Sequence, residues 1–185
     1  MELMGIGGTY RKWIQGCLSS AHFVVLVNGN ANEFFRASRG ILQGDLLSPF
    51  LLTLVAKAFS KMLQGAVDGG FIQGLPAWPN GIVLSHLQYA DDALLFMKAI
   101  NENIQNVWLF LKLYELISGA RINRKKSKII GINCLSSEMS YWASWLECEI
   151  ETFPTKYFGL PLLNGSAPRS MWDPLIQRVV VKLDG

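Results

Sequence analysis

The sequence has few of the residues that build disulfide-rich or metal-bound scaffolds. It contains three cysteines and two histidines among 185 residues, and the cysteines form no Cys-x-x-Cys motif, so we expect neither a zinc site nor a disulfide framework. No signal peptide is visible, because the first residues lack a basic start followed by an apolar stretch. The longest apolar run, residues 50–59, is about half as long as a bilayer-spanning helix. These absences predict a soluble intracellular protein, or a piece of one, without membrane contact.

Charge is also scarce and nearly balanced. Charged residues make up 17% of the chain, and 17 basic against 14 acidic side chains give a net charge of +3. That excess is too small to identify a partner, so the position of the charges matters more than their sum. Half of the residues are hydrophobic and 11% are aromatic, which is enough for a packed core and excludes wholesale disorder.

Helix and strand patterns alternate along the chain. Apolar residues at helical spacing predict helices, whereas short β-branched runs beside turn residues predict hairpins. The predicted helices cover residues 9–18, 49–62, 101–118, 137–146 and 169–183, with Gly119 in a stop position after the third. The predicted strands cover residues 22–28 and 33–38 around Asn28-Gly29, 82–88 and 93–97 around residues 89–92, 128–132, and a short hairpin near 157–162, with a glycine-rich loop at 65–81. Two hairpins imply antiparallel pairing, so we expect an α+β fold without internal repeats.

Asp91 and Asp92 are the most distinctive feature of the sequence. The two adjacent acids lie between apolar strand-like runs. Carboxylates held at a hairpin tip can bind Mg²⁺, a cation that prefers hard oxygen ligands. Phosphoryl transfer by a pair of metal ions would need further carboxylates from a neighbouring strand. The alternative is that Asp-Asp only forms the turn, since aspartate is common in turns.

Two other segments carry groups that could bind phosphates. In the loop 39–49 the glycines let the backbone approach a ligand, while Gln43 and Ser48 offer hydrogen-bond donors; alternatively, Ser48 only caps the next helix. The segment 121–128 holds five positive charges in eight residues without an acid. Such a cluster neutralises phosphates, or it is only a solvated surface. Its cations are Arg121, Arg124, Lys125, Lys126 and Lys128.

Taken together, the motifs resemble the reverse transcriptase of non-LTR (LINE-type) retrotransposons, in particular that of plant elements. The motifs that carry the resemblance are Gln43-Gly44-Asp45 with Leu47-Ser48-Pro49, Tyr89-Ala90-Asp91-Asp92, Ser118-Gly119 with Ile122-Asn123 and Lys126-Ser127, and Tyr157-Phe158-Gly159-Leu160-Pro161-Leu162. Four motifs in the family's order and spacing, over nearly the whole chain, make the resemblance specific. It implies a polymerase palm with an antiparallel sheet and packed helices over residues 1–150. Residues 151–185 would form a primer-grip-like hairpin and the start of a thumb.

The resemblance also implies a role for each matching residue. Asp91 would be a catalytic metal ligand and Asp92 its supporting acidic neighbour, with Mg²⁺ (or Mn²⁺) as the cofactor. Gln43 and Gly44 would lie against the template and the incoming nucleotide, and Lys126 would lie near the triphosphate. The primer end would be held by the hairpin residues Tyr157, Phe158, Gly159 and Leu160. Further nucleic-acid contacts would come from Arg121, Arg124, Lys125 and Lys128.

The partners implied by the resemblance are an RNA template, a DNA primer and a deoxynucleoside triphosphate. The implied reaction is attack of the primer 3′-hydroxyl on the α-phosphate, with the metal ions stabilising the attacking and leaving oxygens. By family habit the protein would be found in the cytoplasm or the nucleus.

The sequence departs from the family pattern in two ways. The family has an earlier strand with another aspartate, of the type Phe-Asp…Lys-Ala-Tyr-Asp, and this chain begins after that point. Leu42 stands where the family usually has arginine, so a contact with phosphate or template is lost. Leu46 stands where the family usually has proline, so the φ angle of the loop is no longer preset. We therefore expect a reverse transcriptase fragment that is inactive alone. The alternatives are a catalytically silent nucleic-acid-binding remnant and a translated relic without function.

Overall fold

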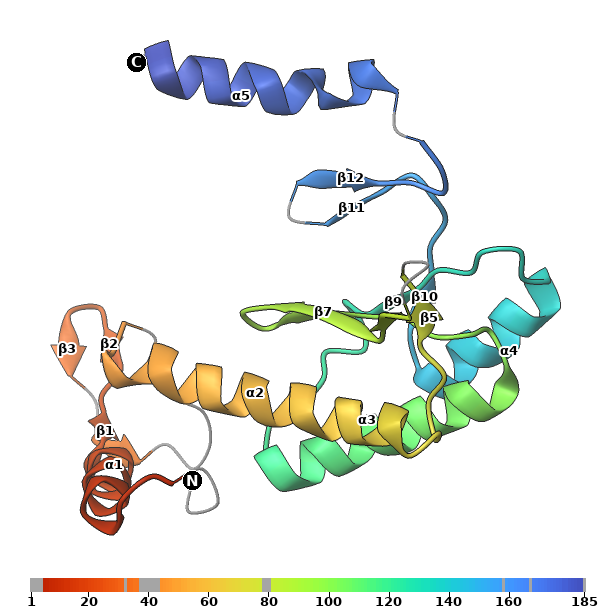
Figure 1. The fold of residues 1–185 in the computed structure, drawn as a ribbon. Helices are drawn as coiled ribbons and strands as arrows, with labels where there is room; N and C mark the ends of the chain where they lie inside the picture. The colour runs from red at the N-terminus through yellow and green to blue at the C-terminus, as the bar shows by residue number, and fades with distance from the viewer. Residues whose placement is uncertain are drawn as a thin grey trace. The chain divides into compact units, whose positions relative to one another are not determined.

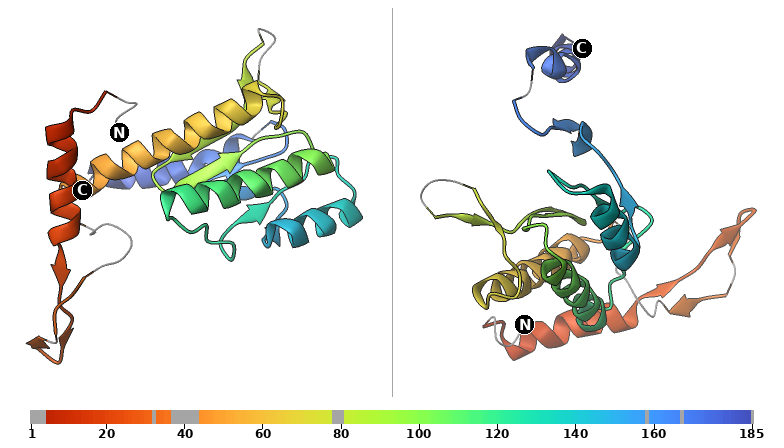
Figure 2. Two further views of the ribbon diagram at one scale, coloured as in Figure 1. Left: turned by 90° about the horizontal axis from the view of Figure 1, so that it is seen from below. Right: turned by 90° about the vertical axis from the view of Figure 1, so that its right-hand side faces the viewer.

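The computed structural model describes residues 5–31, 33–36, 44–77, 81–157, 159–166 and 168–184. The chain divides into two compact units, unit 1 (residues 1–58) and unit 2 (residues 59–185), each of which is described by itself (Figures 1 and 2). Helix α2 (Leu47–Asp68) contributes to both units. Helices and short strands are mixed along the described chain, which confirms the α+β class.

Unit 1 contains a hairpin closed by Asn28 and Gly29. Both residues have positive φ, 50° and 81°, and together they form a two-residue turn, the conformation for which Asn-Gly is the preferred sequence. The hairpin predicted at this place is therefore confirmed. The elements of unit 1 before α2 are α1 (Gly8–Ser20), β1 (His22–Phe23) paired with β4 (Phe35–Arg36), and β2 (Leu26–Val27) paired with β3 (Asn30–Ala31).

Helix α2 is longer than the sequence predicted. The expected helix ended at residue 62 and a loop was expected from residue 65, but α2 continues through Gly65 and ends at Asp68. The additional turn forms because Leu63, which is 1% exposed, packs in the core of unit 2, and this packing outweighs the weak helix propensity of glycine. The chain then leaves the helix at Gly70, whose φ is +74°.

Helix α2 also meets the length and composition criteria for a membrane span. It has 22 residues, and its most apolar window has a mean hydropathy of 1.3 with 17% of the window buried, whereas the sequence predicted only the shorter run 50–59. Core helices of soluble proteins meet the same criteria, so a single helix of this kind is weak evidence for membrane contact.

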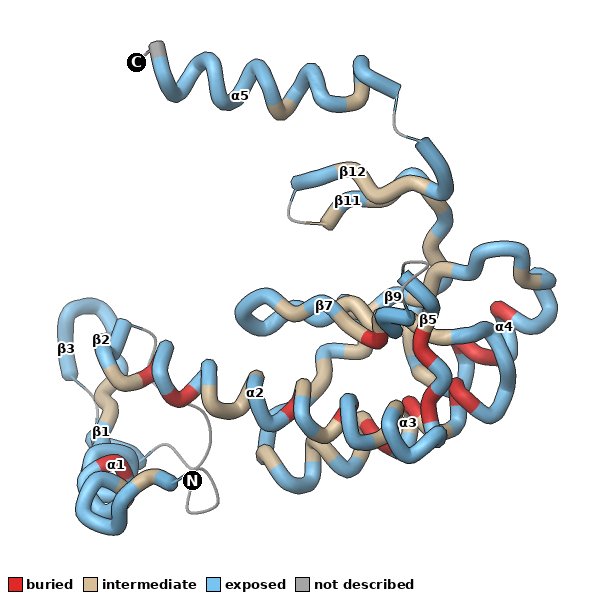
Figure 3. The backbone as a smooth tube through the Cα atoms, in the orientation of Figure 1, coloured by how far each residue is buried: buried red, intermediate tan, exposed pale blue. Residues whose placement is uncertain are grey.

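The core of unit 2 lies between the second half of α2, α3 (Asn101–Ser118) and α4 (Ser136–Leu146) (Figure 3). Helix α3 has the predicted bounds and ends at Gly119, which has the left-handed φ of 70°. Two buried clusters make up the core, one of Phe59, Leu63, Ile72, Val107 and Phe110, the other of Ile104, Met139 and Trp142. Met97 and Leu146 pack against both clusters, which makes the core continuous.

The sheets among the described residues are all two-stranded. The antiparallel pairs of unit 2 are β5 (Leu75–Pro76) with β6 (Val83–Leu84), β7 (His86–Tyr89) with β8 (Asp92–Leu95), and β11 (Thr155–Tyr157) with β12 (Leu160–Leu162). The hairpins predicted around residues 89–92 and near 157–162 are therefore confirmed.

One strand pair and the last helix differ from the prediction in detail. Strands β9 (Lys128–Ile129) and β10 (Glu149–Ile150) are parallel, which the crossover through α4 permits, and β9 is shorter than the predicted 128–132. The helix predicted at 169–183 consists of a 3₁₀ turn, η2 (Arg169–Trp172), followed by α5 (Asp173–Asp184).

Asn103 ties α3 to the segment that follows α2. It is 1% exposed, its Oδ1 accepts a hydrogen bond from the Gln73 N–H at 3.0 Å, and its Nδ2 donates to the Lys98 carbonyl at 2.9 Å. A buried polar group left without a partner costs about 1–3 kcal/mol. We therefore predict that Asn103→Ala lowers the free energy of unfolding, measured by urea denaturation, by about 2–4 kcal/mol.

The matched control for this prediction is Asn106→Ala. Asn106 lies on the same helix and donates to the Phe71 carbonyl at 2.6 Å, but this hydrogen bond is exposed. Water can replace it, so the expected loss is less than about 1 kcal/mol. Equal losses in the two variants would contradict the prediction.

Candidate active site

The β7–β8 hairpin presents the acid pair, Asp91 and Asp92, at its tip. Tyr89 pairs with Asp92 across the two strands, so Ala90 and Asp91 form a two-residue turn. Residues 89–92 are all exposed. The first turn residue, Ala90, has a φ of +51°, a conformation in which glycine is usual and in which an alanine holds about 1–2 kcal/mol of backbone strain. The acid pair therefore lies on a tight and strained turn.

The base of this hairpin is held to α2 by a hydrogen-bond network. Ser60 on α2 donates from Oγ to Gln88 Oε1 at 3.2 Å, and His86 Nε2 lies 2.9 Å from the same hydroxyl. Because the single Ser60 proton goes to Gln88, His86 donates from Nε2 and its Nδ1 accepts from Ser85 Oγ, 3.0 Å away. This arrangement suits a neutral imidazole. Burial lowers the pKa of His86 and favours the same state.

Tyr157 lies at the end of β11 and is influenced by the charge of Asp92. Burial raises the pKa of its phenol, and the Asp92 carboxylate raises it further. A carboxylate has this effect because it disfavours a second negative charge. The Asp92 carboxylate of one hairpin therefore acts electrostatically on the Tyr157 phenol of the other.

The turn of the β11–β12 hairpin also contacts the last helix. Gly159 has a φ of +74°, and a β-carbon at this position would lie 3.6 Å from Arg178 Nη1 of α5. The left-handed φ favours glycine here, whereas a β-carbon 3.6 Å from the guanidinium would make only an ordinary van der Waals contact.

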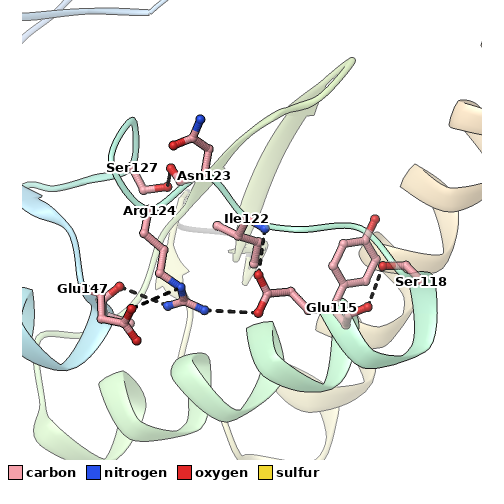
Figure 4. A network of polar contacts seen from close by, with 9 residues as sticks. Glu115, Ser118, Ile122, Asn123, Arg124, Ser127 and Glu147 are labelled. Atoms are coloured by element: carbon pink, nitrogen blue, oxygen red, sulfur yellow. Dashed lines mark hydrogen bonds and ion pairs between the residues drawn. The ribbon is translucent and has the colours of Figure 1, made fainter. Parts of the chain in front are cut away.

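The basic segment, residues 121–128, follows α3 and turns at residues 124–126. Arg121, Lys125 and Lys126 are exposed. Arg124 is instead directed toward Glu115 and Glu147 (Figure 4), and its Nη2 lies 3.2 Å from Glu115 Oε2. Arg124 is therefore one of two cations, among the five predicted to contact phosphates, that are paired with glutamates.

Lys128 is the second of these paired cations. Its Nζ lies 2.8 Å from Glu151 Oε1, and this hydrogen bond raises the pKa of Lys128 while it lowers the pKa of Glu151. Both side chains lie at the surface, so the pair contributes little to stability.

Part of the predicted site lies within unit 2. Asp91, Asp92, Tyr157, Gly159 and Leu160 belong to two hairpins of unit 2, and Lys126 lies on the basic segment of the same unit. Gly44, with a φ of +92°, belongs to unit 1. Gln43 and Phe158 lie outside the described residues.

Several residues around the site were not predicted from the sequence. Ser60, Gln88 and His86 support the hairpin, and Glu115 and Glu151 neutralise cations of the basic segment. The sequence gives no local signal for these contacts, because each joins residues from different elements.

Comparison with known proteins identifies the family of this chain. The profile of the reverse transcriptase (RNA-dependent DNA polymerase) family matches residues 2–162. The chain belongs to the reverse transcriptase family. The match includes the β7–β8 hairpin, the basic segment and the β11–β12 hairpin of this reverse transcriptase domain, and it ends before η2 and α5.

One curated relative is an uncharacterized mitochondrial protein of Arabidopsis thaliana, which is 36% identical to the reverse transcriptase domain over 73 residues. The matched region covers 38% of this chain and 60% of the relative. The reverse transcriptase domain therefore spans less than two thirds of the length of that relative.

Reverse transcriptases use divalent metal ions, so the acid pair is the place to test for a metal site. Asp91 and Asp92 offer two exposed carboxylates, and carboxylate oxygens are the ligands that Mg²⁺ prefers. The described residues contain no group of three or more histidine, cysteine, aspartate or glutamate side chains that could hold a metal ion. The acid pair therefore does not complete a two-metal centre within the described part of the domain.

The lowered pKa of His86 predicts a loss of stability in acid. Above pH about 6.5 the imidazole is neutral in both the folded and the unfolded chain. As the pH falls below this value, the unfolded chain binds the proton first, so stability decreases until the folded-state pKa is reached. We predict that His86→Gln, which keeps a donor for Ser60, shows a smaller decrease in melting temperature between pH about 7.5 and about 5.5 than the wild type. Identical decreases in the two proteins would contradict this assignment.

Proposed function

We propose that the chain is the palm part of the reverse transcriptase of a non-LTR retrotransposon, of the type found in plant elements. The observation that carries the proposal is the pair of exposed carboxylates on a strained hairpin tip, inside the region that matches the family. Such an enzyme extends a primer 3′-hydroxyl with deoxynucleotides on an RNA template, which is a phosphoryl transfer.

Within this proposal each part of the site has a role. Asp91 and Asp92 provide the metal-binding carboxylates for Mg²⁺ or Mn²⁺, and the β11–β12 hairpin holds the primer end. The electrostatic effect of Asp92 on the Tyr157 phenol supports this, because it couples the hairpin that would hold the primer to one of the carboxylates. Lys126, exposed on the basic segment, binds the triphosphate.

We further propose that the chain alone does not polymerise. Two adjacent carboxylates leave two dications with too few negative ligands, and the described residues offer no third acid near them. A further carboxylate from another polypeptide segment would be required for turnover.

Primer extension on poly(rA)/oligo(dT) with dTTP and Mg²⁺ tests this proposal. We predict no extension by the folded chain, because the carboxylate set is incomplete. Extension that is lost in Asp91→Asn but kept in Asp68→Asn would show that the chain completes its own site, and it would overturn the proposed inactivity.

A metal-binding readout in the same series tests the role of the acid pair. Calorimetric titration of Mg²⁺ should detect binding to the wild type and to Asp68→Asn, and a clear loss in Asp91→Asn. Binding that survives Asp91→Asn would contradict the metal assignment, whatever the outcome of the extension assay.

A second candidate function is nucleic-acid binding without catalysis. The specific observation is the exposure of Arg121, Lys125 and Lys126 on one segment. Among the described residues, none of the three forms an ion pair. Closely spaced cations of this kind bind phosphates with little dependence on base sequence.

This candidate predicts a salt-dependent affinity that depends on the basic segment. Lys125→Ala/Lys126→Ala should weaken binding of a fluorescent single-stranded RNA about tenfold and reduce the slope of log affinity against log salt by about 1.4, the value for two lost phosphate contacts. The matched control, Lys61→Ala/Lys98→Ala, removes the same charge from exposed positions elsewhere in the chain. Equal effects of the two double variants would mean that the basic segment is only a solvated surface.

A further inference from the structure

Arg124 differs from its neighbours in the basic segment because its side chain is mostly enclosed. Its side chain is 14% exposed, and that of its partner Glu115 is 20% exposed. The guanidinium donates from Nη2 to Glu115 Oε2 and from Nη1 to the Leu146 carbonyl, both at 3.2 Å, while Nε lies 3.8 Å from Glu147 Oε2. Arg124 therefore connects the ends of α3 and α4 (Figure 4).

Glu115 uses its other oxygen to hold the chain just before the turn. Its Oε1 accepts a hydrogen bond from the Ile122 N–H at 2.8 Å. Although burial opposes ionisation of Glu115, this N–H and the Arg124 guanidinium outweigh it and lower the pKa of the carboxyl. The carboxylate thus fixes the basic segment at two points, residues 122 and 124.

Asn123 closes the turn that precedes β9. Its side-chain Oδ1 accepts from the Lys126 N–H at 3.3 Å, and its carbonyl accepts from the N–H groups of Lys126 and Ser127 and from Ser127 Oγ, each at 3.0 Å. With this backbone fixed, Lys125 and Lys126 are both exposed at the surface.

We propose that Arg124 is a positioning residue and not a phosphate contact. The Glu115–Arg124 pair, which we call the clamp, holds residues 122–127 in the conformation that presents Arg121, Lys125 and Lys126 to a polyanion. This inference rests on the nucleic-acid binding proposed above. It assigns the contacts with phosphates to three of the five cations in the segment. Fixing the backbone before binding lowers the ordering cost of the complex.

The clamp predicts an effect opposite in sign to simple electrostatics. Glu115→Gln removes a negative charge close to the proposed RNA site, so charge alone would strengthen binding of a polyanion. If the clamp positions the lysines, the same change releases the guanidinium and the turn, and binding weakens. The sign of the change in affinity therefore separates the two explanations.

The test is fluorescence anisotropy with a labelled single-stranded RNA at fixed salt, on the full chain. We expect Glu115→Gln to weaken binding about threefold to tenfold because the turn must be ordered on binding. The matched control is Glu149→Gln, which removes the same charge from an exposed position on β10 outside the clamp and should leave affinity unchanged or slightly higher. Arg124→Lys keeps the charge but not the fork of donors, so it should weaken binding as Glu115→Gln does.

Amide hydrogen exchange provides a readout that does not depend on RNA. In Glu115→Gln the amides of Ile122 and Lys126 should lose protection, while the amides in the centre of α3 keep it, which distinguishes a released turn from global unfolding.

Two results would overturn parts of the scheme separately. Tighter binding by Glu115→Gln, matching Glu149→Gln, would contradict the clamp while leaving nucleic-acid binding intact. No binding by the wild type, with the amides of Ile122 and Lys126 still protected, would instead contradict the proposed binding function and leave the clamp as a purely structural contact.

Discussion

Unit 2 depends on the packing around Phe59. This ring is 5% exposed, and it meets Phe110 at 5.2 Å, Tyr114 at 4.9 Å and the imidazole of His86 at 6.3 Å, all in edge-on geometry. Phe110 and Tyr114 belong to α3 and His86 belongs to β7, so a single side chain of α2 connects the helical layer to the hairpin that carries the acid pair. Edge-on aromatic pairs add about 0.5–1.5 kcal/mol to the burial of apolar area.

The sequence predicted those elements whose signals are local. Helix α3 begins and ends as its apolar spacing and Gly119 indicate, and the hairpin at Asn28-Gly29 follows from the φ angles that this dipeptide favours. Helix α2 could not be bounded in this way, because Gly65 remains helical only when Leu63 is packed in the core. Strand β9 is short for a related reason, since its length depends on its parallel partner β10.

The candidate site likewise contains features with a local sequence signal and features that depend on distant residues. The acid pair and its hairpin could be predicted from four consecutive residues, whereas the electrostatic effect of Asp92 on Tyr157 joins parts of the chain far apart in sequence. The basic segment shows most clearly what could not be predicted from the sequence. Charge counting treated its five cations as equivalent, but Glu115, on the preceding helix, turns Arg124 into a support for the backbone.

The register of the β7–β8 hairpin limits how this part of the chain can vary. Tyr89 faces Asp92 across a two-residue turn, and successive side chains of a strand alternate between its two faces. One residue added or lost in the turn would exchange the faces of β8 relative to β7. Asp92 would then change faces relative to His86 and Gln88, whose side chains bond to Ser60 of α2. The register therefore fixes the length of this segment.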